Sequence, residues 1–260
     1  MARLQRKVAM CLMAHPDDCE LLVAGTMALL QQRGWEIHIV TMTPGDCGTT
    51  GMTPAEIARI RRGEGARGAK ILGGTYHCLE SRDLFIMFDE PTLRQTLMLT
   101  REIAPSLMIT HSLVDYMVDH EQTARIARSA SFAYSTPNVC PGPIVKGSGI
   151  PYLYYADPIE GVDVYGDRIV PRTYVNIAKT ISVKTRALKA HASQREWLMK
   201  HHGMDQYLES MKQWGKLRGK EVGVPCAEGF RQHMGHPYPH DCILQKELGD
   251  LVMPVSREGD

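Results

Sequence analysis

Residues 8–20 read VAMCLMAHPDDCE and join an apolar run to a cluster of one imidazole and three carboxylates. The apolar run from Val8 to Met13 predicts a buried strand, and the apolar residues that resume at position 21 predict that a helix begins there. In an open α/β sheet, a turn from strand to helix at the carboxyl edge is where sites are built. We therefore expect a functional site in this turn.

The first half of the chain alternates between patterns typical of strands and of helices. Strands are predicted at residues 35–42, 75–79 and 106–110, and helices at 53–72 and 91–103. Such alternation implies a parallel sheet with right-handed crossovers. The predicted fold class is α/β: a Rossmann-like, mostly parallel sheet flanked by helices, with a smaller C-terminal extension.

The second half gives weaker signals. Residues 135–148 are rich in Pro, Gly and Ser and predict a long loop, followed by strands at 152–156 and 173–177 and a helix at 182–201. Beyond Gln213 the glycines at 215, 219 and 223 are expected to break any helix, and residues 235–240 to form a loop. We expect one domain over residues 1–260, in which 1–134 form the α/β core with a metal site and 135–260 add rim loops and later strands.

Three carboxylates in one turn repel one another, so a divalent cation is the simplest compensating partner. His15 and Asp18 have the donor types that zinc accepts, and the neighbouring Asp17 could deprotonate a water molecule. His120 follows the predicted strand 106–110, whose end should meet the same sheet edge. A helix cap would explain one Asp, but it explains neither His15 nor the second carboxylate. Two imidazoles and one carboxylate with an open position predict a catalytic rather than a structural zinc site.

Further segments extend the pattern along the chain. They are Thr43-Pro44-Gly45-Asp46, Arg61-Arg62-x-Glu64, Thr110-His111 to Asp119-His120, Lys184-x-x-Ala187-Leu188 with His191-x-Ser193-Gln194, and Ala227-Glu228-Gly229-Phe230. Together with the opening motif, they make the sequence resemble the PIG-L/LmbE-like zinc-dependent N-deacetylases. The resemblance implies hydrolysis of an N-acyl amide, typically an acetyl group on an amino sugar. It also implies one Zn²⁺ per chain on His15, Asp18 and His120, with Asp17 as general base.

One position departs from that family. The family usually has His-Pro-Asp-His where this chain has Met117-Val118-Asp119-His120, and a thioether has no proton to give. The first His of the family motif is thought to stabilise the oxyanion or to protonate the leaving amine. His111 is our first candidate to replace it as a catalytic residue, and His236 and His240 are weaker candidates.

Four carboxylates receive supporting roles in this interpretation. Asp119 and Glu20 are expected to orient the ligating imidazoles, although Glu20 could instead interact only with the dipole of its helix. Asp46 and Asp83 are expected to bind sugar hydroxyls, or else to cap neighbouring turns.

The composition sets limits on partners. Thirty basic and 29 acidic residues give a net charge of +1, which argues against a nucleic-acid-binding surface. Seven scattered cysteines without a Cys-x-x-Cys pair are typical of reduced thiols, and no apolar stretch approaches a membrane span. We expect a cytoplasmic enzyme, which could form a homo-oligomer, that acts on a small, sugar-linked N-acyl substrate. Two alternatives stay open: an amidase of a larger thiol-conjugate or antibiotic-type amide, and a zinc-containing binding protein without turnover.

Overall fold

A computed structural model describes residues 7–49, 51–140, 149–195 and 206–255. In these residues one sheet has the strand order β3-β2-β1-β4-β5-β7-β6-β8. The strands are β1 (Val8–Met13), β2 (Glu36–Thr41), β3 (Thr75–Cys78), β4 (Leu107–Thr110), β5 (Tyr152–Ala156), β6 (Thr173–Asn176), β7 (Ala227–Gln232) and β8 (Val252–Pro254). The first five strands pair in parallel, and β7, β6 and β8 continue the sheet antiparallel. The predicted α/β fold with a mostly parallel sheet is confirmed.

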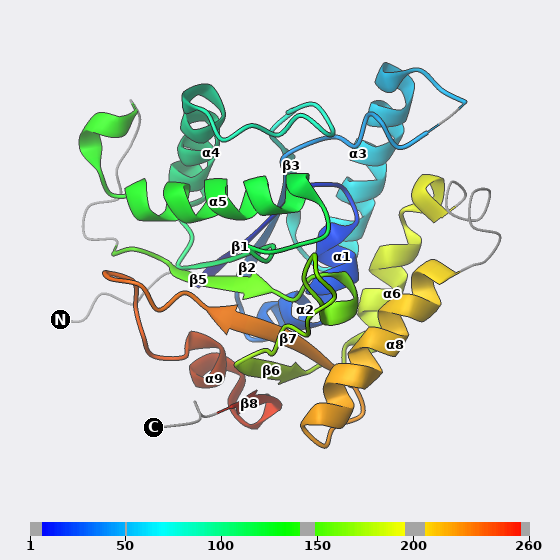
Figure 1. The fold of residues 1–260 in the computed structure, drawn as a ribbon, viewed down its shortest axis with the longest axis vertical. Helices are drawn as coiled ribbons and strands as arrows, with labels where there is room; N and C mark the ends of the chain where they lie inside the picture. The colour runs from blue at the N-terminus through cyan, green and yellow to red at the C-terminus, as the bar shows by residue number, and fades with distance from the viewer. Residues whose placement is uncertain (1–6, 50, 141–148, 196–205, 256–260) are drawn as a thin grey trace.

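Helices cover both faces of the sheet (Figure 1). They are α1 (Asp18–Leu22), α2 (Ala24–Gln32), α3 (Pro54–Ile71), α4 (Glu90–Ile103), α5 (Val118–Ala133), α6 (Ile181–Lys189), α8 (Gln206–Glu221) and α9 (Ile243–Leu248). The pleat of β1 sends Ala9, Cys11 and Met13 into the core shared with α2 and α9. Met10 and Leu12 point to the opposite core, which α4 and α5 cover. Strand β1 is therefore buried on both faces, as its continuous apolar sequence predicts.

The C-terminal half contains one helix that the glycines were expected to prevent. Helix α8 continues through Gly215 and Gly219. A Cβ atom at Gly215 would clash with the sulfur of Cys226, and one at Gly219 would clash with the carbonyl oxygen of Val224. The prediction of a broken helix was wrong because the glycines let α8 pack closely against the segment before β7. Within the described ranges, no helix has both the length and the apolar character that a bilayer crossing requires.

The sheet brings the two polar clusters together. Strands β1 and β4 are hydrogen-bonded neighbours, and Leu12 pairs with Thr110 near their carboxyl ends. The turn after β1 and the loop after β4 therefore open at the same edge. Strands β2 and β3 end at this edge too, so the segments that carry Asp46 and Asp83 follow it.

Candidate metal centre

The turn between β1 and α1 fixes the positions of His15 and Asp18. The backbone N–H of His15 donates to Asp18 Oδ2 at 2.8 Å, and the backbone N–H of Asp18 approaches the His15 carbonyl oxygen at 3.4 Å. Between them Asp17 has a left-handed backbone with φ of 104°, which Asp adopts more readily than most residues. The turn thus directs Asp17 and Asp18 differently.

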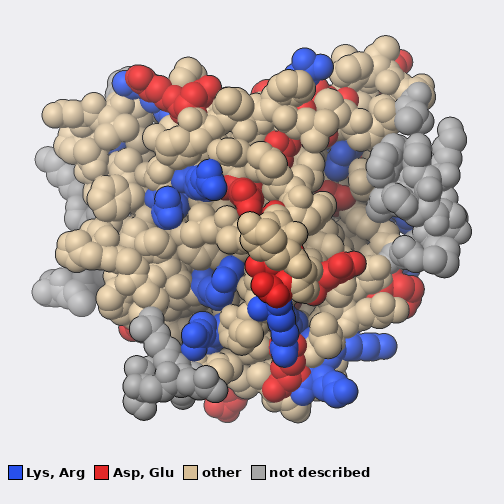
Figure 2. Space-filling model, in the orientation of Figure 1, with Lys and Arg blue, Asp and Glu red and all other residues tan. Residues whose placement is uncertain are grey.

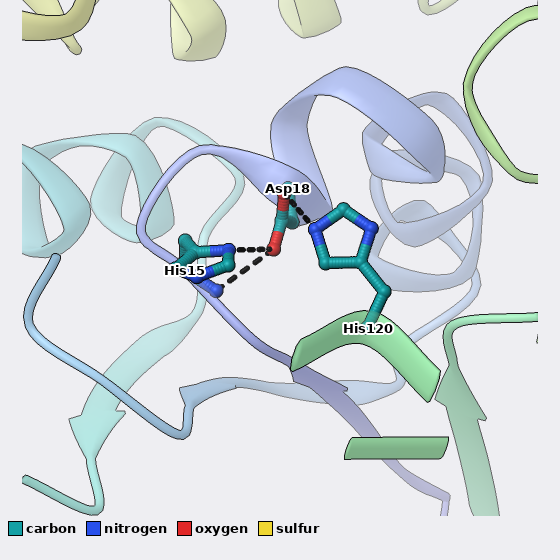
Figure 3. Close-up of side chains that lie close together, drawn as sticks. All are labelled: His15, Asp18 and His120. Atoms are coloured by element: carbon teal, nitrogen blue, oxygen red, sulfur yellow. Dashed lines mark hydrogen bonds and ion pairs between the residues drawn. The ribbon is translucent and has the colours of Figure 1, made fainter. Parts of the chain in front are cut away.

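His15, Asp18 and His120 lie together, as the sequence predicted (Figure 3). Asp18 Oδ2 is 3.4 Å from His15 Nδ1, and Asp18 Oδ1 is 3.6 Å from His120 Nε2. The two imidazole centroids are 5.4 Å apart. One donor atom from each of the three buried residues lies within 4.8 Å of the other two. This donor set could hold a metal ion.

The ring nitrogens that face away from Asp18 have carboxylate partners. His15 Nε2 lies 3.0 Å from Asp83 Oδ1 and 3.2 Å from Asp119 Oδ2. His120 Nδ1 lies 2.9 Å from Asp115 Oδ1. Carboxylates placed in this way fix the tautomer and orientation of metal-binding imidazoles. The residues present therefore fit a divalent cation, because each ring keeps its other nitrogen for the ion.

The charges of the cluster favour a cation. Burial raises the pKa of Asp18, but His120 and His111 together hold it well below its usual range. Burial lowers the pKa of His15, yet bonds to Asp119, Asp18 and Asp83 raise it well above its usual value. The surrounding carboxylates thus attract positive charge to this point, whether a proton or a metal ion.

Asp17 turns its carboxylate toward two other helices. Its Oδ1 atom is 3.5 Å from an Nη atom of Arg61 on α3, and its Oδ2 atom accepts a hydrogen bond from the hydroxyl of Tyr207 on α8. Burial raises the pKa of Asp17, and the charge of Arg61 opposes that shift. A carboxylate with a raised pKa is suited to accept a proton near neutral pH.

A cavity of about 830 Å³ opens over these groups. Among the described residues, its acidic lining side chains are Asp17, Asp18, Asp83 and Glu160, and Arg61 is the arginine that lines it. The apolar and aromatic side chains of its walls are Leu21, Leu84, Tyr116, Met117, Ile159, Val162, Tyr207 and Trp214. On the visible face, acidic and basic side chains are scattered among uncharged ones (Figure 2).

His111 lies beneath the cluster rather than in the cavity. It is fully buried, its Nε2 is 3.1 Å from Asp18 Oδ2 and 3.0 Å from the backbone nitrogen of Ala14, and its ring stacks on His120 at 3.9 Å. It is absent from the cavity lining. His236 and His240 are exposed and also lie outside that lining. The position of His111 suits support of Asp18 better than contact with a substrate.

The other carboxylates with predicted supporting roles are Asp119, Glu20 and Asp46, and not all of them contact the expected partner. Asp119 contacts His15, as already described, whereas Glu20 lies with its Oε1 3.3 Å from Nε2 of the buried His191. Asp46 accepts a hydrogen bond from the backbone N–H of Asp83 at 2.9 Å and does not line the cavity. Asp46 therefore fits the alternative of a turn cap.

Three residues of the site were missed by sequence reasoning. Asp115 is five residues before His120, which hinted at a shared loop but not at a contact. Arg61 and Tyr207, which both contact Asp17, received no role at the site from the sequence. For Tyr207 the sequence carries no signal, because it lies 190 residues from Asp17.

The chain is similar in sequence to known proteins. Residues 10–131 match the model of the PIG-L family, described as GlcNAc-PI de-N-acetylase. A 4-oxalmesaconate hydratase of Pseudomonas putida is 25% identical over 233 residues, covering 86% of each chain. Diacetylchitobiose deacetylase of Thermococcus kodakarensis is 25% identical over 198 residues, covering 72% of this chain and 70% of its own.

The fold has solved counterparts as well. The crystal structure of the 4-carboxy-2-hydroxymuconate hydratase of Pseudomonas putida KT2440 superposes with a TM-score of 0.74 at 24% identity, covering 91% of this chain and all of that one. At this identity the likeness concerns the fold. Through residues 10–131, the chain is similar to the PIG-L family, in agreement with the resemblance seen in its motifs.

Proposed function

We propose that the protein is a zinc-dependent hydrolase that removes an N-acyl group, in the first place acetyl, from an amino-sugar-type small molecule. His15, Asp18 and His120 would hold one Zn²⁺ per chain. The observation that carries the proposal is the convergence of these three donors beside the Asp17 carboxylate, at the base of one cavity. The similarity to a diacetylchitobiose deacetylase supports the choice of an N-acetyl sugar.

Amide cleavage makes three demands on a site. Resonance makes the carbonyl carbon a poor electrophile, so water must be activated, the carbonyl oxygen polarised and the amine protonated. A divalent cation bound here would lower the pKa of water toward about 7 and act as a Lewis acid on the carbonyl oxygen. The protein must then supply the groups that move protons.

Asp17 is the residue placed to move the proton. Its carboxylate would accept a proton from the attacking water and then transfer that proton to the nitrogen as the carbon–nitrogen bond breaks. The products are a carboxylic acid and a free amine. His15 and His120 are the histidines among the described residues that line the cavity, and both are assigned to the metal. With Met117 in the family position, Asp17 would serve as both base and acid.

The charges of the cavity favour a substrate without carboxylates. Asp17, Asp18, Asp83 and Glu160 line it, whereas Arg61 already donates to the backbone oxygens of Pro16 and Gly45 and pairs with Asp17. Because Arg61 is engaged, an anionic substrate would find no free cationic side chain in the described lining and would depend on the bound metal ion for charge compensation. A neutral N-acyl amide needs no such compensation.

Hydration of a carbon–carbon double bond is a second candidate, favoured by two observations. A hydratase matches 86% of the chain, and Met117 replaces the histidine that in the family pattern would protonate a leaving amine, a step that hydration does not contain. The carboxylate substrate named for the related structure would, however, find no free cationic side chain among the described lining residues. We therefore place hydration second.

An assay of the zinc-loaded protein separates the candidates. Acetate release would be measured from N-acetylglucosamine and diacetylchitobiose, release of the free amine from a larger thiol-conjugate amide, and hydration of 4-carboxy-2-hydroxymuconate by its absorbance. We expect acetate from an N-acetyl sugar with wild type and none with Asp17→Asn. Cleavage of the larger amide alone would favour the amidase alternative, and hydration alone would favour the hydratase. A zinc-loaded protein inactive in every assay would be a binding protein.

A further inference from the structure

Both oxygens of the Asp17 carboxylate are engaged by residues from distant parts of the chain. Arg61 of α3 approaches Oδ1, and the Tyr207 hydroxyl of α8 donates to Oδ2. Asp17 precedes the first residue of α1, yet its side chain makes no capping hydrogen bond to that helix. The direction of the carboxylate is therefore set by α3 and α8 rather than by its own turn.

The surroundings of Tyr207 leave its hydroxyl few other partners. The side chain is 9% exposed, and its ring packs in a cluster with Leu21, Leu188, Leu208 and Met211. A buried phenol needs a hydrogen-bond partner, and the carboxylate of Asp17 is the one that the structure provides. Burial raises the pKa of Tyr207 well above its usual value, which keeps the hydroxyl protonated and able to donate.

We propose that Tyr207 is a positioning residue for Asp17: its hydroxyl holds Oδ2 and so aims the carboxylate into the cavity. The proposal rests on the proposed role of Asp17 in activating water. Its consequence for the fold is that α8, from the C-terminal half, completes a site whose metal donors come entirely from the first half. A phenylalanine in place of Tyr207 would preserve the packing of the ring and lose only this hydrogen bond.

A double-mutant cycle tests whether Tyr207 acts through Asp17. The variants are Tyr207→Phe, Asp17→Ala and the double variant, each loaded with zinc. We expect Tyr207→Phe to lower kcat about 10- to 100-fold, the range typical of outer hydrogen-bond partners. Its KM and bound zinc should stay within about twofold of wild type. In the Asp17→Ala background, adding Tyr207→Phe should change the residual rate less than about twofold.

Tyr174→Phe is the matched control. The Tyr174 hydroxyl also donates to a carboxylate, Glu221 Oε2 on α8, at 2.7 Å, but it does not line the cavity. This variant should keep kcat within about twofold of wild type. An equal loss with Tyr174→Phe would mean that Tyr207→Phe acts by loosening α8, and would overturn the positioning role. So would a normal kcat for Tyr207→Phe, or an equal loss with and without Asp17.

The cycle also distinguishes failure of this proposal from failure of the proposed function. If wild type hydrates a double bond instead of cleaving an amide, the same four proteins are compared in that reaction. If wild type is inactive in every assay, thermal unfolding decides. Tyr207→Phe should then lower the midpoint by about 2 to 4 °C in the wild-type background and by clearly less in the Asp17→Ala background. Equal shifts in both backgrounds would show that the two side chains are not coupled.

Discussion

Asp115 Oδ1 lies 2.9 Å from His120 Nδ1, and the opposite nitrogen of that ring faces Asp18. The same carboxylate accepts a hydrogen bond from the backbone N–H of Met117 at 3.2 Å, which ties it to the start of α5. Asp115 thus connects the fold of the loop after β4 to the orientation of a proposed metal ligand. Its burial, at 2% exposure, protects this contact from water.

Asp115→Asn should weaken zinc binding by about 10- to 100-fold, because the amide no longer strengthens the basicity of His120 as a carboxylate does. Competition with a chromophoric chelator would measure the affinity. Asp167→Asn is the control, because Asp167 is exposed, forms its hydrogen bonds with Asp163 and does not line the cavity. Equal affinities for the two variants would contradict the role of Asp115.

Asp17→Asn should retain zinc and lose about 10²- to 10⁴-fold in kcat, because the amide cannot accept the proton of water. Metal content and steady-state rates on the same preparation would check both halves of the prediction. A variant with near-normal kcat would contradict the assignment of Asp17 as general base.

His111→Ala should lower zinc affinity and turnover together, because the ring contacts Asp18 and stacks on His120 instead of facing the cavity. The activity of the variant would be measured at limiting and at saturating zinc. Much of the lost turnover should be recovered at saturating zinc. A loss of turnover with unchanged zinc affinity would instead restore the catalytic role that the sequence suggested.

Asp157, directly after β5, should make stability depend on pH. Burial raises its pKa to about 6, Arg218 opposes the shift at 2.7 Å, and Oδ1 has no hydrogen-bond partner among the described residues. The folded chain then binds this proton more tightly than the unfolded chain, whose Asp titrates near its usual value of 3.8. The protonated Asp157 therefore contributes unfolding free energy below about pH 4, and this contribution declines as the pH rises to about 6.

Asp157→Asn removes that titration. Relative to this variant, wild type should lose about 2 kcal/mol of unfolding free energy between pH 4 and pH 7. Urea unfolding of both proteins at a series of pH values would measure the difference. A difference between them that stays constant over this range would show that the carboxylate is ionised throughout.

The sequence predicted that His15, Asp18 and His120 converge because two simple rules sufficed. An unbroken apolar run at 8–13 marked a buried parallel strand, and parallel strands end at one edge, so His15 and His120 were expected to meet. The contacts that orient those rings followed no such rule. Asp83 contacts His15, and Asp115 contacts His120, only because of the paths that their loops take. The distance from Asp115 to His120 depends on how the chain turns at Met117.

Two further misses have the same physical origin. Glu20 was interpreted from its place on α1, but its partner His191 comes from the region after α6. Helix α8 was not expected because glycine lowers helix propensity, a local cost that close packing against residues 224–226 offsets. Tyr207 depends on that helix, so its contact with Asp17 could not be foreseen.

Anomalous scattering at the zinc edge, from crystals grown with one equivalent of Zn²⁺, tests the central claim most directly. The account predicts one strong peak per chain within about 2.0 to 2.2 Å of His15 Nδ1, a carboxylate oxygen of Asp18 and His120 Nε2. A peak bound by other residues, or no peak at this cluster, would contradict it.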